Sequence, residues 1–396
     1  MNLLVVTNLY PPQELGGYGR SIADFVWGLQ KRGHKIIVLS SDAPHLGASS
    51  DIGPSGESVD RRLQLKGSYK GGVSHLNDHN QRRKIDEENT KLIRSWITQR
   101  KWDGVLVGNL DLVGPEVLPV LLEAQCCLQH HVGFVHSPFP PSAWPKSNRY
   151  KIVAASKTVR LALINAGLPA SKASVIYPGI RSELFGEDKV GMPSPLASKG
   201  SKKRPLKVCF AGLLMGSKGA HTLVEALIQL NQEGICVQAS IAGDNFQTGY
   251  REKLEEDLKL NNLNGVVQFV GQLERKELAR FYALHHVGVF PSIHPEAFGI
   301  VAAEMMATGL VVVSSGVGGA GELIEDGKTG LRFKAGDSKD LAKKLRQLAR
   351  DPELLECIRQ AGQKEARKRF NVMTSAEELE AGFLADTDTT KEIMVF

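Results

Sequence analysis

The feature that most constrains the fold is a series of short apolar segments separated by helical patterns, and the series occurs twice along the chain. In the first half the apolar segments are Leu3–Thr7, Lys35–Ser40, Val105–Val107, Val132–Val135 and Ile152–Ala155. Strands of this kind are typical of parallel sheets whose two faces are both covered by helices. Arg20–Arg32 has the pattern of a helix between the first two segments, so the chain opens with a βαβ unit.

The same alternation begins again after residue 204. The apolar segments there are Lys207–Ala211, Val237–Ala242, Val266–Val270, Val287–Phe290 and Val311–Val313. A length of 396 residues suits two domains, each large enough to bury a core of its own. We therefore predict an α/β fold with two tandem Rossmann-like, doubly wound parallel-sheet domains and a cleft between them. Such sheets bind ligands at the carboxyl ends of their strands.

Composition divides the chain into predicted parts. Residues 1–180 form the first domain, 181–204 a linker with Gly, Pro, Ser and a cluster of Lys and Arg, and 205–374 the second domain. Residues 43–80 show no periodicity and are predicted to be a long, partly ordered insertion. Further helices are predicted at 82–100, 156–166, 219–233, 249–260, 338–369 and 375–384.

Two acids, Glu296 and Glu304, stand eight positions apart with an apolar sequence between them. They follow the predicted strand Val287–Phe290, and Gly299–Ala307 is predicted to be a helix. Glu296 would then lie in the loop at the start of the helix, with Glu304 about two turns away on nearly the same face. The next strand leads into Gly316-Val317-Gly318-Gly319, a turn whose backbone N–H groups suit an anion.

This arrangement resembles the donor site of the retaining GT-B glycosyltransferases of family 4. The sequence Glu-x-Phe-Gly-x-x-x-x-Glu follows Pro-Ser and precedes Ala-x-Gly, Val-Val, Ser, Gly-Gly and Glu at the spacing of that family. The resemblance covers both domains and is strongest between Lys207 and Gly330. It implies that a sugar moves from a UDP- or GDP-sugar to a hydroxyl of a glycan, lipid-linked or small-molecule acceptor. It also implies retention, a metal-independent front-face mechanism, and a C-terminal segment, about 375–396, that crosses back onto the first domain.

The segment Ala211–Gly219 resembles the family sequence Gly-Arg-Leu-x-x-x-Lys-Gly, in which Arg and Lys hold the diphosphate. Lys218 occupies the Lys position, but Leu213 stands where the family has Arg. We expect Glu304 to accept hydrogen bonds from the ribose hydroxyls, because one carboxylate can accept two of them. The residues expected to bind the donor are Gly16, Gly17, Gly212, Lys218, Ala297, Phe298, Gly299, Ile300 and Glu304.

The residues expected to take part in the chemistry are His136, Glu296 and Lys218. Glu296 would lie beside the transferred sugar, where it either holds hydroxyls or stabilises developing positive charge; both roles stay open. His136 follows a predicted strand, and the resemblance places it near the sugar and the acceptor. Asn109 and Asp111 are further candidates on the acceptor side.

Two other functions are weighed against this one. The loss of Arg at Leu213 favours a non-catalytic nucleotide-sugar-binding protein, and an epimerase of the same fold is the second alternative. No metal is predicted, because the one Asp-x-Asp sequence, 386–388, lies in the polar C-terminal tail. No cofactor is expected beyond the nucleotide-diphosphate sugar as co-substrate.

Net charge and hydropathy indicate where in the cell the protein is expected and which partners it has. The formal net charge is +6, no apolar run approaches bilayer length, and the five cysteines lack metal-ligand spacing. We expect a cytoplasmic enzyme of a polysaccharide pathway, with no nucleic acid among its partners. Peripheral contact with the inner face of the membrane is a further expectation. Its candidate elements are Lys66–Lys70, Arg82–Lys84, and Lys146–Lys151 with Trp144.

Overall fold

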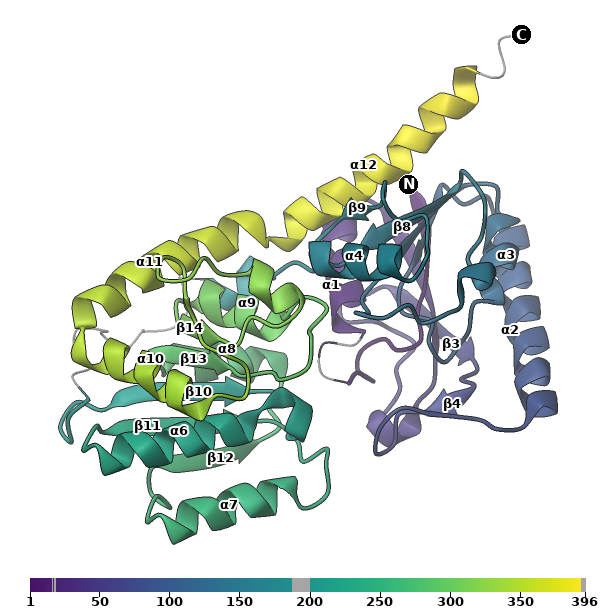
Figure 1. The fold of residues 1–396 in the computed structure, drawn as a ribbon. Coiled ribbons are helices and arrows are strands. Elements are labelled where there is room, and N and C mark those ends of the chain that lie inside the picture. The colour runs from purple at the N-terminus through teal and green to yellow at the C-terminus, as the bar shows by residue number, and fades with distance from the viewer. Residues whose placement is uncertain (16, 18, 187–199, 393–396) are drawn as a thin grey trace. The chain divides into compact units, whose positions relative to one another are not determined.

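The computed structural model describes residues 1–15, 17, 19–186 and 200–392, with side chains up to residue 385 (Figure 1). Its contacts divide the chain into two compact units. Unit 1 comprises Met1–Gly179 and Val372–Phe396, and unit 2 comprises Ile180–Asn371. Each unit contains a parallel sheet with helices, so the predicted α/β class with two Rossmann-like domains is confirmed. The predicted cleft concerns the placement of one unit against the other and stays a prediction.

The sheet of unit 1 has the strand order β3-β2-β1-β6-β7-β8-β9, and every adjacent pair is parallel. The chain moves outward from β1 in one direction to β2 and β3 and in the other to β6, so the switch point lies between β1 and β6. The strands are β1 (Asn2–Val6), β2 (Lys35–Ser41), β3 (Ser58–Leu63), β6 (Gly104–Val107), β7 (Cys127–Val132), β8 (Tyr150–Ala154) and β9 (Ser174–Val175).

The first and last helices of unit 1 pack on each other and on the sheet. Ala376, Leu379 and Phe383 of the last helix are fully buried in one core with residues of β1 and the first helix. Gln129 Nε2 in β7 also donates to the Leu379 carbonyl at 2.7 Å. The helices are α1 (Arg20–Lys31), η1 (Pro44–Leu46), α2 (His79–Gln99), α3 (Val117–Leu122), η2 (Pro141–Ala143), α4 (Lys157–Asn165) and α12 (Val372–Glu392), and a short hairpin pairs β4 (Gly67–Ser68) with β5 (Ser74–His75).

Two sequence-based predictions for unit 1 were wrong in detail. The predicted strand Val132–Val135 is displaced, because β7 spans Cys127–Val132 and includes the buried polar side chains of Gln129, His130 and His131. The segment 43–80 is more ordered than predicted, since β3 pairs with β2 and closes one edge of the sheet. In β7 buried polar residues interrupt the apolar pattern, and in β3 the buried apolar residues are only Val59 and Leu63, so neither strand stands out as an apolar run.

The sheet of unit 2 has the order β12-β11-β10-β13-β14-β15 and is also parallel. Its switch point lies between β10 and β13. The strands are β10 (Leu206–Ala211), β11 (Val237–Ala242), β12 (Val267–Gly271), β13 (Val287–Phe290), β14 (Val311–Ser314) and β15 (Leu331–Arg332).

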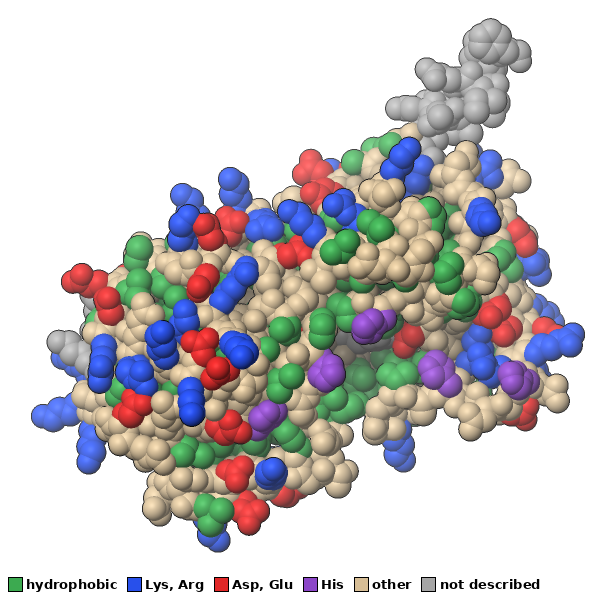
Figure 2. Space-filling view, viewed as in Figure 1, with side chains coloured by type: hydrophobic (Ala, Val, Ile, Leu, Met, Phe, Trp, Pro, Cys, Tyr) green, Lys and Arg blue, Asp and Glu red, His purple; other side chains and the backbone are tan. Residues whose placement is uncertain are grey.

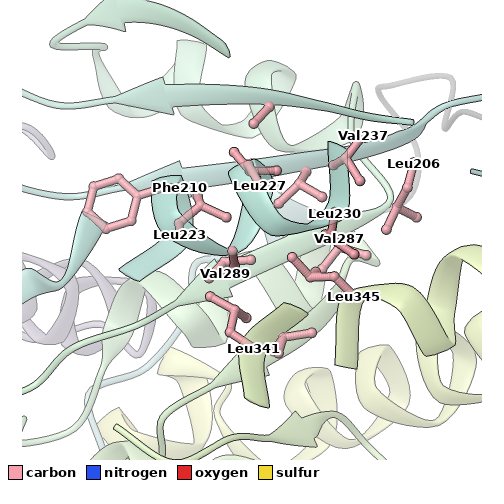
Figure 3. Packing of buried hydrophobic residues seen from close by; sticks show 14 of the residues in the cluster. Leu206, Phe210, Leu223, Leu227, Leu230, Val237, Val287, Val289, Leu341 and Leu345 are labelled. Carbon is pink, nitrogen blue, oxygen red and sulfur yellow. The ribbon is translucent and has the colours of Figure 1, made fainter. Parts of the chain in front are cut away.

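Helices cover both faces of this sheet (Figure 1). One core joins β10, β11 and β13 to α6 and α10 through Phe210, Val237, Val289, Leu223 and Leu341 (Figure 3). The helices are α5 (Ser182–Phe185), η5 (Gly216–Lys218), α6 (Ala220–Gln232), α7 (Tyr250–Leu260), α8 (Arg275–Ala283), α9 (Ile300–Thr308), η6 (Gly319–Glu322), α10 (Ser338–Arg350) and α11 (Pro352–Arg369).

Two parts of the chain differ from the sequence-based prediction. The stretch predicted as a linker contains α5, whose Phe185 is buried against Tyr282 of α8. Residues 187–199 of that stretch lie outside the described residues. The helical stretch 338–369 is two helices, divided at Asp351, which caps α11 by accepting from the Leu354 N–H. Among the described residues, no helix is both long and apolar enough to span a bilayer.

Candidate functional site

The carboxyl ends of β10 and β13 lie on either side of the switch point in unit 2, and a loop from each contributes a charged side chain. Lys218 follows β10 in η5, and Glu296 follows β13. Parallel neighbouring strands end at the same edge of a sheet, which brings these loops together although 78 positions separate the two residues.

Lys218 and Glu296 form an ion pair. Lys218 Nζ donates to Glu296 Oε1 at 2.7 Å, and Ser292 Oγ donates to the same oxygen at 2.5 Å. The side chains are 32% and 17% exposed, respectively, so both charges face solvent in part. The pair therefore presents a fixed ammonium and a fixed carboxylate side by side at the edge of the sheet.

The loops that carry this pair are joined by backbone contacts. The Ile293 N–H donates to the Ser217 carbonyl at 2.8 Å. A Cβ at Gly219, where φ is +73°, would lie only 2.0 Å from the Pro291 carbonyl oxygen. Glycine at this position thus allows η5 to approach the loop after β13 closely.

A second glycine allows the turn after β14 to pair with Glu296. The Glu296 N–H donates to the Val317 carbonyl at 3.3 Å, and its own carbonyl accepts from the Gly319 N–H at 2.7 Å. A Cβ at Gly318, where φ is +68°, would lie 2.5 Å from the Glu296 carbonyl oxygen. The Gly-rich turn predicted from the sequence is therefore a backbone support for Glu296.

Two helices begin at these loops without a side-chain cap. Their N-cap residues are Gly219 for α6 and Gly299 for α9, both with positive φ. In α9 the Ala303 N–H donates to the Gly299 carbonyl, so the N–H groups before Ala303 precede the first turn of intrahelical bonds. Such N–H groups, with the positive end of the helix dipole, suit an anionic group.

The residues predicted around Glu296 lie at the start of α9. Phe298 is 3% exposed and its ring contacts Phe370 edge-on, with centroids 5.4 Å apart. Its side chain therefore belongs to the core, and only its backbone faces the loop. Ile300 is buried as the first residue of α9, and Ala297 is half-buried.

Glu304 is fully buried in α9 and has a cationic neighbour that the sequence did not indicate. Arg275 Nη2 donates to Glu304 Oε1 at 3.1 Å, and the Arg275 guanidinium lies 5.6 Å from the centre of the Phe185 ring. The capping box of Glu274 and Glu277 marks the start of α8 in the sequence. This motif does not indicate that Arg275, the residue after Glu274, reaches Glu304 in α9.

Further residues missed by the sequence analysis hold η5 in place. Gln247 Oε1 accepts from the Gly216 N–H at 2.9 Å, and the Leu214 N–H donates to the Asp244 carbonyl at 2.8 Å. Tyr250 shares a hydrogen bond with His221 Nδ1 at 2.7 Å, and burial raises the pKa of this tyrosine. Gly212 lies beside Gly243, where a Cβ would come 1.8 Å from the Gly212 carbonyl oxygen.

In unit 1, the loop after β1 contains Gly17, which is half-buried, and Gly16, which lies outside the described residues. The start of this loop is anchored from β3. Arg61 is 8% exposed, and its Nη1 and Nη2 donate to the Tyr10 and Pro11 carbonyls at 3.0 and 2.6 Å. Burial lowers the pKa of this guanidinium, although its nitrogens have carbonyl partners.

His136 is exposed in the loop after β7. Asn109 and Asp111 follow β6, and Asp111 accepts a hydrogen bond from Asn8 Nδ2 in the loop after β1. These residues thus come from the carboxyl ends of β1, β6 and β7, which lie at one edge of the sheet of unit 1. His136 belongs to unit 1, whereas Lys218 and Glu296 belong to unit 2, so each is placed only within its own unit.

The arrangement in unit 2 can bind an anion and a group rich in hydroxyls. Lys218 and uncapped helix N–H groups supply positive charge, and the Glu296 carboxylate accepts hydrogen bonds. In the part of the chain that the structure describes, no group of three or more His, Cys, Asp or Glu side chains is placed to hold a metal ion. The side chains of 386–388 lie outside that part.

Two family models match the chain, one in each half. The model described as "Glycosyltransferase Family 4" matches residues 15–184, and the model described as "Glycosyl transferases group 1" matches residues 196–365. Together they cover the sheet of unit 2 and all strands of the unit 1 sheet except β1. They include the loops that carry Lys218 and Glu296, and α9 with Glu304.

Individual proteins are similar to this chain over about half of its length or over nearly all of it. Glycogen synthase of Mycobacterium tuberculosis is 24% identical over 400 residues, which cover 97% of this chain and 95% of the synthase. Sulfoquinovosyl transferase of Arabidopsis thaliana is 34% identical over 211 residues, covering 52% of this chain and 39% of that protein. The crystal structure of Anabaena HepE in complex with UDP has a TM-score of 0.76 at 22% identity, and covers 97% of this chain and 100% of HepE. The crystal structure of HepE in complex with UDP-glucose has a TM-score of 0.74.

Proposed function

This chain belongs to family 4 of the GT-B glycosyltransferases, and we propose that it is a retaining hexosyltransferase that uses a UDP- or GDP-sugar. The acceptor is a hydroxyl of a glycan, of a lipid-linked molecule or of a small molecule. The observation that carries this proposal is the Lys218–Glu296 pair, in which an ammonium and a carboxylate are held 2.7 Å apart beside two uncapped helix N-termini.

The leaving diphosphate is stabilised by Lys218 and by backbone N–H groups at the starts of α6 and α9. Negative charge grows on the diphosphate oxygen as the bond to the sugar breaks, and donors already in place stabilise this charge without reorganisation. Leu213 removes the Arg of the family sequence, so Lys218 is the main cation of this loop. The reaction then needs no metal, because an ammonium and helix dipoles supply the positive charge.

Glu296 lies next to Lys218, where the transferred sugar joins the diphosphate. Its Oε1 accepts from both Lys218 and Ser292, which leaves Oε2 to accept from sugar hydroxyls or to stabilise positive charge near the anomeric carbon. In the front-face reaction, the bond from the anomeric carbon to the diphosphate breaks while the acceptor oxygen attacks from the same side. Attack from the side on which the diphosphate leaves retains the configuration of the anomeric carbon, and the acceptor proton passes to the leaving diphosphate oxygen. His136 is assigned to the acceptor side.

Glu304 is assigned to the ribose hydroxyls, with Arg275 holding its Oε1. Because Glu304 is fully buried, a ribose reaches it only if neighbouring side chains shift on donor binding. A hexosyl donor with a uridine base is supported by the similar fold of HepE, which was crystallised with UDP and with UDP-glucose.

The first test is a thermal-shift screen against UDP-, GDP-, ADP- and TDP-sugars, followed by NMR of the product to determine its anomeric configuration. The wild-type protein should be stabilised by one nucleotide class, and the shift should vanish in Glu304→Ala. Lys218→Met should lower donor hydrolysis or transfer by about 10²–10³-fold. Lys328→Met is the matched control, since Lys328 is 70% exposed and pairs only with Glu325 among its described contacts.

The outcomes separate the candidate functions. Stabilisation without hydrolysis or transfer would support the non-catalytic nucleotide-sugar-binding protein that Leu213 favours. A change in the configuration of the donor sugar itself would indicate the epimerase. No stabilisation by any nucleotide sugar would contradict the assignment of the site, and inversion at the anomeric carbon would contradict the front-face mechanism.

A further inference from the structure

A cavity of about 680 Å³ lies along α11 in unit 2, and none of the residues assigned to the donor or the acceptor is among its described lining. That lining contains four cations, two amides and no acid: Arg359, Gln360, Gln363, Lys364, Arg367 and Lys368. Side chains one and four positions apart lie along one side of a helix, so the lining forms a single stripe. Cavities of this size hold small molecules. We call it the α11 cavity.

The acids of α11 itself are paired or lie before the stripe. Glu356 accepts two hydrogen bonds from Arg359, at 2.8 and 2.6 Å, so these two charges neutralise each other. Glu365 pairs with Arg369 at 3.6 Å. Glu353 is exposed in the first turn of the helix, about 9 Å along the axis from Arg359. These carboxylates therefore leave the later part of the stripe positively charged.

The acids of the elements packed against α11 also have partners of their own. These elements are α9, α10 and β14. In α9 the acid is Glu304, which pairs with Arg275. At α10 and its two ends, Asp337, Asp340 and Asp351 each accept a backbone N–H. The strand β14 contains no acid.

Lys364 and Lys368 are exposed and one turn apart, and no acid pairs with either among the described residues. In the loop before β15, Glu325 pairs with Lys328, and Asp326 accepts from a backbone N–H. Figure 2 shows acidic side chains among the Lys and Arg side chains over the position that α11 occupies in Figure 1. The excess of positive charge is therefore confined to the stripe and does not extend over a whole face.

Two residues of the lining hold the carboxyl end of α9. Gln363 Nε2 and Arg367 Nε both donate to the Ala307 carbonyl, each at 3.2 Å. The last carbonyls of a helix have no partner within it, and the helix dipole favours a cation beside them. Arg367 therefore caps α9 and lines the α11 cavity at the same time.

The helix α9 connects this cavity with the donor loop. Its first residue, Ile300, comes four positions after Glu296, and its nine residues span about 14 Å. Eight of the nine are buried. Because close-packed interiors transmit displacements, a shift at Ala307 reaches the loop that carries Glu296.

We propose that the α11 cavity binds a small phosphate ester, and that this ligand weakens donor binding through α9. The two lysines and Arg367 bind the phosphate oxygens, and the Gln360 amide binds hydroxyls of the esterified group. Binding draws Arg367 toward the phosphate and away from the Ala307 carbonyl, so Gln363 alone still holds the end of α9. The binding step is independent of the proposed function, whereas the effect on the donor rests on it.

A long polyanion fits this site less well than a small ester. Glu353 and Glu356 precede most of the stripe along α11, and Glu365 lies on the other side of the helix. A nucleic acid that followed the helix would meet these carboxylates. A small ester would contact the two lysines and Arg367 without reaching them.

Isothermal titration calorimetry of the full-length protein at low ionic strength tests the binding step. Glucose 6-phosphate should bind, and inorganic phosphate should bind at least about fivefold more weakly, because it lacks the hydroxyls. Lys364→Gln with Lys368→Gln should weaken binding of glucose 6-phosphate at least about tenfold. Both side chains are exposed, so this double variant should keep the urea midpoint of the wild type.

Lys339→Gln with Lys343→Gln is the matched control, because these lysines are exposed one turn apart on α10 and the loss of charge is the same. Lys218→Met should also leave binding of glucose 6-phosphate unchanged, which excludes the diphosphate site. Absence of wild-type binding, or an equal loss in either control, would overturn the proposal. Equal affinity for inorganic phosphate would overturn the assignment to an ester, and tighter binding of a short DNA duplex would indicate a polyanion surface instead.

A second titration measures the effect on the donor site. UDP and GDP are each titrated with and without saturating glucose 6-phosphate, and the Kd of the nucleotide that binds should rise about fivefold. The rise should vanish in the Lys364/Lys368 double variant. If it persists there, the ester competes at the donor site, and coupling through α9 is refuted, as it is by an unchanged Kd in the wild type. If neither nucleotide binds, the proposed function fails and the coupling fails with it, while the first titration still decides whether the cavity binds an ester.

Discussion

Gly318→Ala should disable the site while leaving the fold of unit 2 largely intact. At φ +68° and ψ −144°, Gly318 has a conformation that other residues disfavour, at a cost of about 1–3 kcal/mol. The added Cβ would lie 2.5 Å from the carbonyl oxygen and 2.6 Å from the nitrogen of Glu296. To reach an ordinary contact of 3.4 Å, the Glu296 backbone must move by about 0.9 Å.

This displacement would move the Glu296 carboxylate away from Lys218. A misplacement of about 1 Å in a catalytic group costs about 10²-fold in rate, so we expect a loss of that size in kcat. The hydrogen bond from the Gly319 N–H to the Glu296 carbonyl, now 2.7 Å, would also be weakened, at about 1 kcal/mol. Unfolding free energy should therefore fall by about 2–4 kcal/mol in total.

Gly327→Ala is the control for this experiment. Gly327 has φ +78°, and a Cβ there would have no atom within 4 Å. It therefore reports the cost of the positive φ without a clash. Donor hydrolysis and urea unfolding would be measured for both variants. If Gly318→Ala kept wild-type kcat, or if Gly327→Ala lost as much activity, support of Glu296 by the glycine turn would be refuted.

Three further predictions concern pH, a buried ion pair and the donor. Burial lowers the pKa of His130 to about 3 and of His131 to about 4, from 6.5. Below pH 6.5 the unfolded chain therefore binds more protons than the folded one. The two neutral histidines cost no free energy of unfolding above that pH, and the free energy of unfolding falls as the pH drops from 6.5 toward 4. At pH 5 the loss is about 2 kcal/mol for each histidine, and equal urea midpoints at pH 7 and 5 would contradict this. Arg275→Met removes a cation that is paired with the buried Glu304 carboxylate, and should lower the free energy of unfolding by about 3–5 kcal/mol. A loss below about 1 kcal/mol in urea unfolding would show that the pair is not needed for stability. Leu213→Arg should tighten UDP binding about tenfold, measured by calorimetry, because the added guanidinium can bind the diphosphate. The activity of this variant should be the same with and without EDTA. A loss of activity in EDTA would show that a metal takes part.

The strands that the sequence predicted well are those buried on both faces. In β1, β10, β13 and β14 nearly every residue is apolar, so the segment is visible without knowing its neighbours. In β7, Gln129, His130 and His131 are buried because α12, Tyr150 and the Ile176 carbonyl supply hydrogen-bond partners. Those partners lie far away in the sequence, so a local pattern could not indicate that the polar residues were interior.

In the candidate site, too, the sequence predicted what a local motif contains and missed the contacts between distant segments. The motifs gave the loop positions of Lys218 and Glu296, because each motif carries its own strand and helix start. They could not give the support from Gly318, Gln247 and Ser292, since these contacts join separate loops across the end of the sheet. The roles of Lys218, Glu296, Glu304 and His136 stay predictions until the variants are measured.

The position of α12 has a consequence for synthesis on the ribosome. Unit 2 is one continuous segment, Ile180–Asn371, whereas unit 1 needs both ends of the chain. Ala376, Leu379 and Phe383 complete the core around Phe25 of α1, and they are translated about 350 residues after it. The half that leaves the ribosome first is therefore the last that can finish folding. Until α12 arrives, its binding face on α1 and β7 is exposed to chaperones and to other chains.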